Sequence, residues 1–231
     1  MKKNLCLIMT LLILAAFASC AAPSGNAPVL PPTRIGAVSM TVSLRKYHTF
    51  KEAVEDADAI AKICIGDWLG EDTDGSQTFF EAEVLECFKG EIPKTFVLSQ
   101  LGCSEYTLDS HPLFTSGNEF LVFLTEIPED VFVDLNADYE MYWITGSYIA
   151  ILDVAYDDSG NRYYAATYWG GTSKSFGESM DIPTNYMKNR EIFNQIYANA
   201  IADDPIRTEI YHPYPYVFAE EDVIALIERY Q

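Results

Sequence analysis

The chain has 231 residues, of which 49% are hydrophobic and 21% are charged, and its formal net charge is −19. This apolar content is enough for a sizeable core and argues against wholesale disorder. The acidic balance argues against binding to a nucleic acid, because a phosphate backbone requires a basic surface. Tyr and Phe are abundant, with 15 and 13 copies, and favour a β-rich fold.

The first twenty residues have the pattern of a secretory leader. Two lysines precede an apolar run, Leu5 to Phe17, which is too short for a comfortable membrane span. Two small residues then precede Cys20. This pattern resembles the lipobox of bacterial lipoproteins, although Phe17 stands where that motif usually has Leu. The resemblance implies cleavage before Cys20 and acylation of its thiol, so that the protein is held on the extracytoplasmic face of the cell membrane. Ordinary cleavage nearby, which leaves a free thiol, is the alternative.

A tether is expected to follow the anchor. Ala21 to Thr33 is rich in Pro, Ala, Ser and Gly, which cannot build a core. Loss of the leader removes Lys2 and Lys3, so 13 of the 15 basic side chains remain against 34 acidic ones, and the net charge becomes −21. This charge favours solubility and repulsion from anionic surfaces, with attraction of cations or basic partners as the alternative.

A helix and a hairpin are predicted at the start of the folded domain. Thr49 and Glu52 have the spacing of a capping box, which predicts a helix over 49–57. A strand is expected over 58–68. The segment from Gln77 to Leu101 is interpreted as a β-hairpin whose turn lies at 89–93. Apolar and acidic residues alternate in its first strand, and the alternation breaks at Val84-Leu85, which a β-bulge would explain.

The later part of the domain is also predicted to be β-structure. The apolar run 119–124 is typical of a central strand that is covered on both faces. Further strands are expected at 141–153 and 162–169, and an extended segment at 211–216, where two prolines disfavour helix. Apolar residues at helical spacing predict a helix over 186–202. A final helix is predicted over 220–230, with acidic residues at its N-terminal end and Arg229 near its C-terminal end.

These predictions divide the chain into four parts. They are a leader (1–19), an anchor and tether (20–45), a β-domain (46–175) and a helical C-terminal extension (176–231). The short segment 35–44 is interpreted either as a first strand or as part of the tether.

Four segments carry a resemblance to a known family. They are Asp58-Ala-Ile, Phe79 to Gly90, His111 to Leu124, and Tyr142 to Gly146. Their order resembles a family of uncharacterised lipoproteins, mainly from Gram-positive bacteria. The resemblance implies a small antiparallel barrel of OB type, distantly similar to the inhibitory module of tissue inhibitors of metalloproteases. Inhibition of metalloproteases is not implied, because the zinc-chelating N-terminal Cys of those inhibitors has no counterpart here. The predicted fold is therefore a mostly β, OB-like barrel with a short N-terminal helix and a C-terminal helical extension.

Candidate sites are few. The sequence contains none of the motifs GxSxG, HExxH, GxGxxG or the Walker loop. The loop before the hairpin resembles an incomplete EF-hand, with Asp72, Asp74 and Glu81 as possible Ca²⁺ ligands, but an ordinary turn explains it better. Cys64, Cys87 and Cys103 are interpreted as buried free thiols, with a Cys64–Cys87 disulfide as the alternative.

Aromatic residues gather in the late strands. Some of them should belong to the core, and any that share an exposed face would form a platform for a sugar ring or a peptide. The candidates for ligand binding are Trp143, Tyr148, Tyr164 and Trp169. We expect a non-catalytic lipoprotein that binds a protein, peptide or glycan at the envelope and needs no cofactor. A carboxylate-dependent hydrolase and a Ca²⁺-stabilised surface protein are the alternatives.

Overall fold

The computed structural model describes residues 38–40, 49–73, 75–108, 113–128, 131, 140–146, 150–168, 176–184, 191–192 and 211–231. Most of these residues form β-strands, as the composition predicts. The barrel strands are β2 (Ala59–Glu71), β3 (Gln77–Lys89), β4 (Thr95–Leu101), β6 (Glu119–Glu126) and β7 (Met141–Ile144). Among the described residues, no helix is long and apolar enough to cross a membrane.

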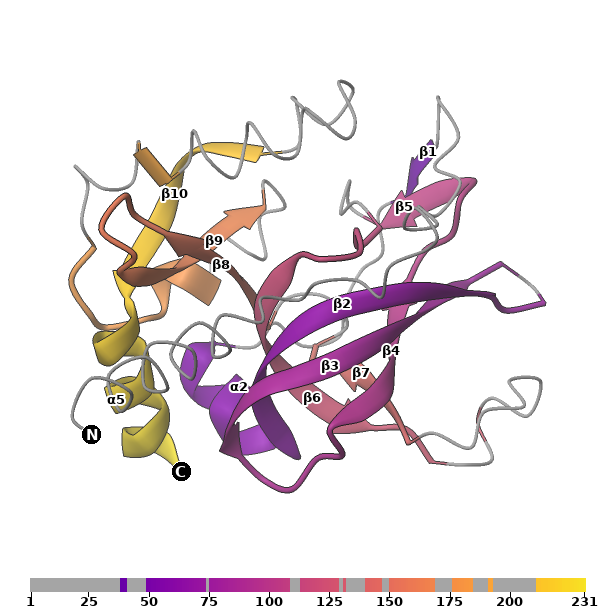
Figure 1. Ribbon diagram of the computed structural model, residues 1–231, viewed down its shortest axis with the longest axis horizontal. Helices are drawn as coiled ribbons and strands as arrows, with labels where there is room; N and C mark the ends of the chain where they lie inside the picture. The colour runs from indigo at the N-terminus through magenta and orange to yellow at the C-terminus, as the bar shows by residue number, and fades with distance from the viewer. Residues whose placement is uncertain are drawn as a thin grey trace, which may run out of the picture.

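Five strands close into a barrel (Figure 1). The antiparallel ladder runs from β6 through β2 and β3 to β4. The short strand β7 closes it, because it pairs in parallel with β4 and antiparallel with β6. A small, closed five-stranded barrel is the architecture of the OB fold, so the predicted fold class is confirmed.

The barrel interior is filled by aliphatic and aromatic side chains. Cross-strand partners share a face, and the interior residues follow this rule from strand to strand: Ile65 lies opposite Ala82, and Ala82 lies opposite Phe96. The rings of Phe96 and Tyr142 pack edge to face, with centroids 5.2 Å apart. All of these side chains are buried, so the alternation in the hairpin marks one core-facing and one outer face.

The predicted bulge in β3 is confirmed. Ile63 pairs with Val84 and Lys62 pairs with Glu86, so Leu85 is an extra residue in β3. Another of the register shifts in this pair lies where Ala61 pairs with Cys87 and Ile60 with Lys89. These shifts explain why the alternation of the sequence fails near the end of the first hairpin strand.

A second, open sheet branches from the barrel at β6. The first half of β6 pairs with β8 (Ile151–Tyr156), whereas its second half pairs with β7. Beyond β8 follow β9 (Arg162–Tyr168) and β10 (Tyr211–Ala219), both antiparallel. We call β8, β9 and β10 the C-terminal sheet. The sequence predicted these segments as extended but did not predict that they leave the barrel, so the C-terminal extension adds a strand to this sheet as well as a helix.

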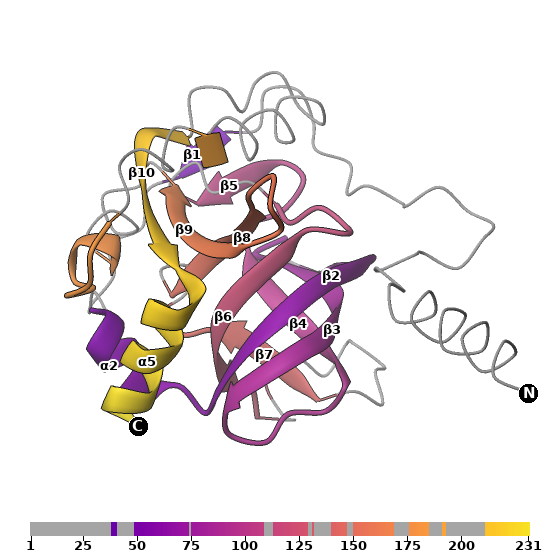
Figure 2. The same ribbon diagram turned by 60° about the vertical axis from the view of Figure 1, so that its left-hand side comes forward.

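Two helices cover the outer wall of the barrel. Helix α2 (Phe50–Asp56) begins at the predicted capping box: the Glu52 backbone N–H donates to Thr49 Oγ1 over 3.2 Å, and the Thr49 N–H donates to Glu52 Oε2 over 2.9 Å. Helix α5 (Glu220–Tyr230) lies beside α2 (Figure 2). Phe50 packs edge to face on Phe123 of β6, with ring centroids 5.3 Å apart. The predicted helix over 186–202 lies outside the described residues except for 191–192, which are helical.

The chain enters the described structure at a separate pair of strands. Strand β1 (Val38–Met40) pairs in parallel with β5 (Tyr106–Leu108), which follows β4. Both views place this pair at the end of the molecule opposite the turn between β3 and β4 (Figures 1 and 2). Part of segment 35–44 is therefore a strand.

Candidate functional site

The lipidation site lies outside the described residues, as does the whole predicted leader. Acylation of Cys20 stays a prediction from the sequence.

The four candidate aromatic residues do not form one face. Tyr164 of β9 is fully buried and belongs to the core, whereas Trp143 of β7 lies on the outer wall of the barrel with 37% of its surface exposed. Their strands belong to different parts of the structure, since β7 closes the barrel and β9 lies in the C-terminal sheet. Tyr148 and Trp169 lie outside the described residues. Trp143 is thus the described residue that fits the predicted platform.

Polar side chains lie beside Trp143 on both neighbouring strands. Its cross-strand partners are Ser99 on β4 and Thr125 on β6. Ser99 Oγ donates to Gln77 Oε1 over 2.7 Å, and the Thr125 hydroxyl is 2.9 Å from that of Thr145. An indole face bordered by hydroxyl and amide groups is suited to stacking on a flat or ring-shaped ligand that also forms hydrogen bonds.

The acidic loop behaves as a turn. Asp72 Oδ1 accepts a hydrogen bond from the Gln77 N–H over 3.0 Å, and Oδ2 accepts one from Ser76 Oγ over 2.7 Å. Glu81 lies farther along β3, where a Cβ on Gly66 would come within 3.2 Å of its Oε1. Asp74 lies outside the described residues, and in the described part of the chain no three His, Cys, Asp or Glu side chains are grouped to hold a metal.

The three cysteines of the domain are free thiols. Cys64 and Cys103 are buried as predicted, but Cys87 is exposed, so the predicted burial is wrong for Cys87. Although β2 and β3 are paired, Cys64 lies opposite Glu83 and Cys87 lies opposite Ala61, so the alternative Cys64–Cys87 disulfide is wrong.

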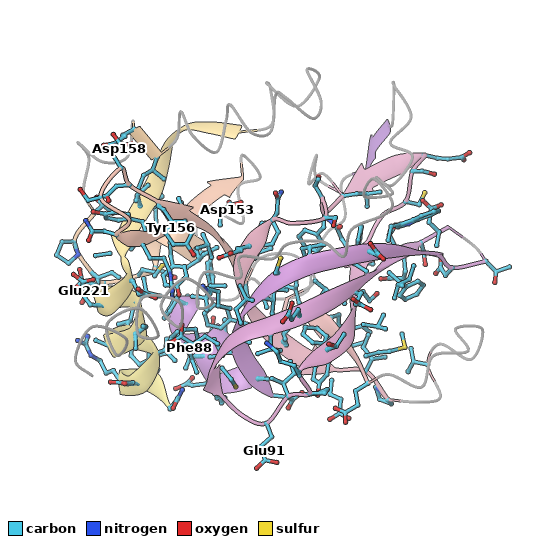
Figure 3. The ribbon with its side chains drawn as sticks, viewed as in Figure 1. Phe88, Glu91, Asp153, Tyr156, Asp158 and Glu221 are labelled. Carbon is cyan, nitrogen blue, oxygen red and sulfur yellow. The ribbon has the colours of Figure 1, made fainter. Side chains whose placement is uncertain are left out.

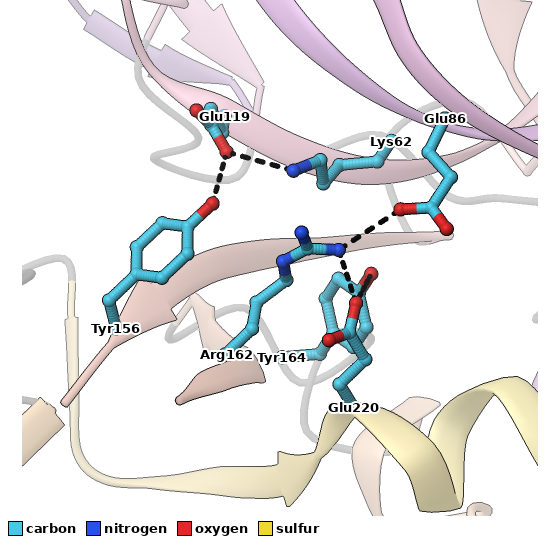
Figure 4. A network of polar contacts seen from close by, with 7 residues as sticks. All are labelled: Lys62, Glu86, Glu119, Tyr156, Arg162, Tyr164 and Glu220. Carbon is cyan, nitrogen blue, oxygen red and sulfur yellow. Dashed lines mark hydrogen bonds and ion pairs between the residues drawn. The ribbon is translucent and has the colours of Figure 1, made fainter. Parts of the chain in front are cut away.

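A charged network joins the barrel to the C-terminal sheet (Figure 4). No sequence motif predicted this network. We call it the junction network, and its members come from six elements: Lys62, Glu86, Glu119, Tyr156, Arg162, Tyr164 and Glu220. The only signal for it in the sequence was Lys62, a charged residue in the otherwise apolar run 59–65.

One half of the junction network is built on Glu119 of β6. Its Oε2 lies 3.5 Å from Lys62 Nζ and accepts a hydrogen bond from the Tyr156 hydroxyl over 2.9 Å. The Lys62 side chain is 8% exposed, so its charge is almost removed from water and depends on this carboxylate. Burial, followed by the hydrogen bond to Glu119, raises the pKa of Tyr156 to about 12.

The other half is built on Arg162 of β9. Its Nη1 donates to Glu86 Oε2 of β3 over 3.1 Å and also contacts Glu220 Oε1 at the start of α5. Burial lowers the pKa of Arg162, but hydrogen bonds with Tyr164 and Glu86 and the charge of Glu220 outweigh it, so the pKa lies above its usual value. The guanidinium therefore stays charged and ties together the barrel, β9 and α5.

The junction network is a structural joint. Its carboxylates contact cations of the same network, and its tyrosines hold their protons more tightly than usual, which does not suit a general acid. Partly buried ion pairs of this kind fix the orientation of the parts that they join more than they add net stability.

A second polar group lies at the barrel end near the turn between β3 and β4. The Tyr142 hydroxyl donates to Glu140 Oε2 over 2.9 Å, and Glu126 N–H donates to Asp58 Oδ2 over 3.0 Å. Burial, the bond to Glu140 and the nearby charges of Glu126 and Asp58 raise the pKa of Tyr142 well above its usual value. The three carboxylates are exposed to solvent, whereas a glycosidase-like pair would flank a substrate cleft with one raised pKa.

Three residues from the segments that carry the family resemblance, Asp58, Lys89 and Gly90, lie at this same end. Lys89 Nζ donates to the backbone oxygens of Val54 and Ala57, over 2.6 and 2.7 Å, and so caps the C-terminal end of α2. Gly90 has φ of 75°, and a Cβ there would lie only 2.2 Å from the Asp58 backbone oxygen. These motif residues therefore have a structural role: they lock α2 and the start of β2 onto the hairpin turn.

No family model matches the chain, and no curated protein is similar to it at a significant level.

Proposed function

We propose that the protein is a lipid-anchored, non-catalytic module that binds a protein, peptide or glycan at the extracytoplasmic face of the cell membrane. Two features support this function: the lipobox-like segment with its Pro-rich tether, and the exposed indole of Trp143 on the barrel wall. The resemblance to envelope lipoproteins agrees with both.

The anchor follows from the chemistry of Cys20. Each buried CH₂ of an acyl chain contributes about 0.8 kcal/mol to membrane binding, so two chains hold a protein stably on a bilayer. The tether, which starts at Ala21, would then separate the acidic barrel from the lipid surface.

Trp143 is the observation that carries the binding function. Tryptophan is among the residues that contribute most to binding interfaces, because its indole combines a large apolar surface with one hydrogen-bond donor. The hydroxyls of Ser99 and Thr125, on the strands that flank Trp143, are hydrogen-bonded to Gln77 and Thr145.

The test compares Trp143→Ala with Leu69→Ala. Leu69 is also an exposed apolar residue on a barrel strand, 43% exposed, and it serves as the matched control. Both variants and the wild type are screened on a glycan array and in pull-downs from detergent-solubilised envelopes. We expect a specific ligand for the wild type, retained by Leu69→Ala and weakened by about 2 kcal/mol or more in Trp143→Ala. The absence of any specific ligand, or equal binding by Trp143→Ala, would contradict the proposal.

The Ca²⁺-stabilised protein remains an alternative with a simple test. Asp72 uses its carboxylate in the loop itself, so we expect excess EDTA to leave the melting temperature unchanged. A lower melting temperature in EDTA, restored by Ca²⁺, would support the alternative. The hydrolase alternative would require one of the three carboxylates near Tyr142 to be essential for turnover.

A further inference from the structure

The point at which the chain joins the barrel is fixed by β1. Val38 pairs with Tyr106, Ser39 with Thr107 and Met40 with Leu108. A chain that arrives from Cys20 therefore meets the molecule beside β5, and not at the first helix, α2.

These two places lie at opposite ends of the molecule. Both views show β1 and β5 at one end and the turn between β3 and β4, with α2 close to it, at the other (Figures 1 and 2). Strand β3 connects the two ends and has 13 residues, which corresponds to roughly 40 Å at about 3.3 Å per residue. The two ends would thus lie at clearly different heights above a surface.

The β1–β5 pair is the first part of the described structure that follows Cys20 in the chain. Residues 21–37 separate Cys20 from β1. The lipid anchor would therefore act on the molecule at the β1–β5 end, whereas the opposite end is joined to the anchor only through the fold.

Charge strengthens the same orientation. The mature chain carries a net charge of −21, and anionic lipids repel it. Because repulsion draws the body away from the surface while the tether holds one point, the point of attachment becomes the part nearest to the lipid.

We propose that the barrel stands on the membrane with its β1–β5 end toward the lipid and presents the β3–β4 turn, α2 and α5 outward. This orientation rests on the proposed acylation of Cys20. It places the surface around the Lys89–Gly90 turn within reach of partners in the envelope. If β1 did not pair with β5, the chain would join the folded domain at Thr49 beside α2, and the opposite end would face the lipid.

A matched pair of fluorescent labels tests the orientation. Glu105 directly precedes β5, and Glu91 projects from the β3–β4 turn into solvent (Figure 3). Both are exposed glutamates, so Glu105→Cys and Glu91→Cys change the charge equally. Each is made in a Cys87→Ser background, because Cys87 is an exposed thiol while Cys64 and Cys103 are buried.

The full-length acylated variants are reconstituted in vesicles of phosphatidylglycerol and phosphatidylcholine that contain a head-group spin label. We expect the probe at position 105 to be quenched at least twofold more than the probe at position 91. Adding Ser39→Pro, which disrupts β1, should remove this difference while the protein still floats with the vesicles.

Equal quenching, stronger quenching at position 91, or a difference that survives Ser39→Pro would overturn the proposed orientation. Failure of the protein to float with the vesicles is a different result, since it contradicts the acyl anchor itself and with it the proposed function.

Discussion

The barrel and the junction network are stabilised by different kinds of interaction. The barrel interior is apolar and aromatic, and its strands are mostly neighbours in the sequence, as in the hairpin of β3 and β4. The junction network joins residues that are far apart in the chain, such as Glu86 and Arg162, and depends on charge. The barrel is therefore expected to tolerate changes of pH and salt, whereas the attachment of the C-terminal sheet should respond to both.

The largest expected effect on stability comes from a substitution in the barrel. Gly90→Ala places a Cβ at 2.2 Å from the Asp58 backbone oxygen, at a φ of 75° that already disfavours a side chain. We expect a loss of about 3 kcal/mol or more in the free energy of unfolding, measured by urea denaturation.

Gly160→Ala is the matched control in the C-terminal sheet. Its φ is 80°, almost the same, but no atom lies within 4 Å of the added Cβ. We expect the free energy of unfolding to fall by about 1 kcal/mol, because of the backbone conformation alone. Equal losses in the two variants would show that the close contact at Gly90 does not matter.

The next effect concerns the junction network. Arg162→Met leaves Glu86 and Glu220 without their cation. We expect the free energy of unfolding to fall by about 2 kcal/mol. Hydrogen exchange should accelerate in β9, β10 and α5 more than in β3 and β4. The control is Lys51→Met, which removes the exposed ion pair of Lys51 with Glu55. It should lower the free energy of unfolding by less than about 1 kcal/mol. Uniform acceleration over the whole chain would argue that Arg162 does not act at the junction.

The smallest expected effect is a pH dependence of stability that arises from Tyr156 in the junction network. The folded pKa of Tyr156 is raised to about 12, mainly by burial and by its bond to Glu119, while an unfolded Tyr titrates near 10. The folded state thus holds this proton more tightly, and the stability that it contributes is present below pH 10 and is lost between pH 10 and 12. Tyr156→Phe should reduce the fall in melting temperature over that interval. An unchanged fall would place the alkaline transition elsewhere.

The local structure could be predicted because its causes are local. The capping box of Thr49 and Glu52, the hairpin from Gln77 to Leu101 and the bulge near Leu85 each left a pattern within a few residues, and each is confirmed. The closed barrel followed from the family resemblance carried by these patterns.

The long-range contacts could not be predicted in the same way. Arg162 finds Glu86 and Glu220 only because the C-terminal sheet branches from the barrel at β6, and no periodicity encodes that branch. Tyr164 and Trp143 have the same aromatic character in the sequence, yet one is fully buried and the other is exposed, since burial depends on which strands cover them.

Mass spectrometry of the membrane-extracted protein tests the central claim of a lipid-anchored module most directly. We predict that the N-terminal peptide of the mature protein begins at Cys20 and carries the added mass of acyl chains, and that Cys20→Ser abolishes both the modification and retention in the membrane. A mature N-terminus at another residue, or an unmodified thiol at Cys20, would contradict the claim.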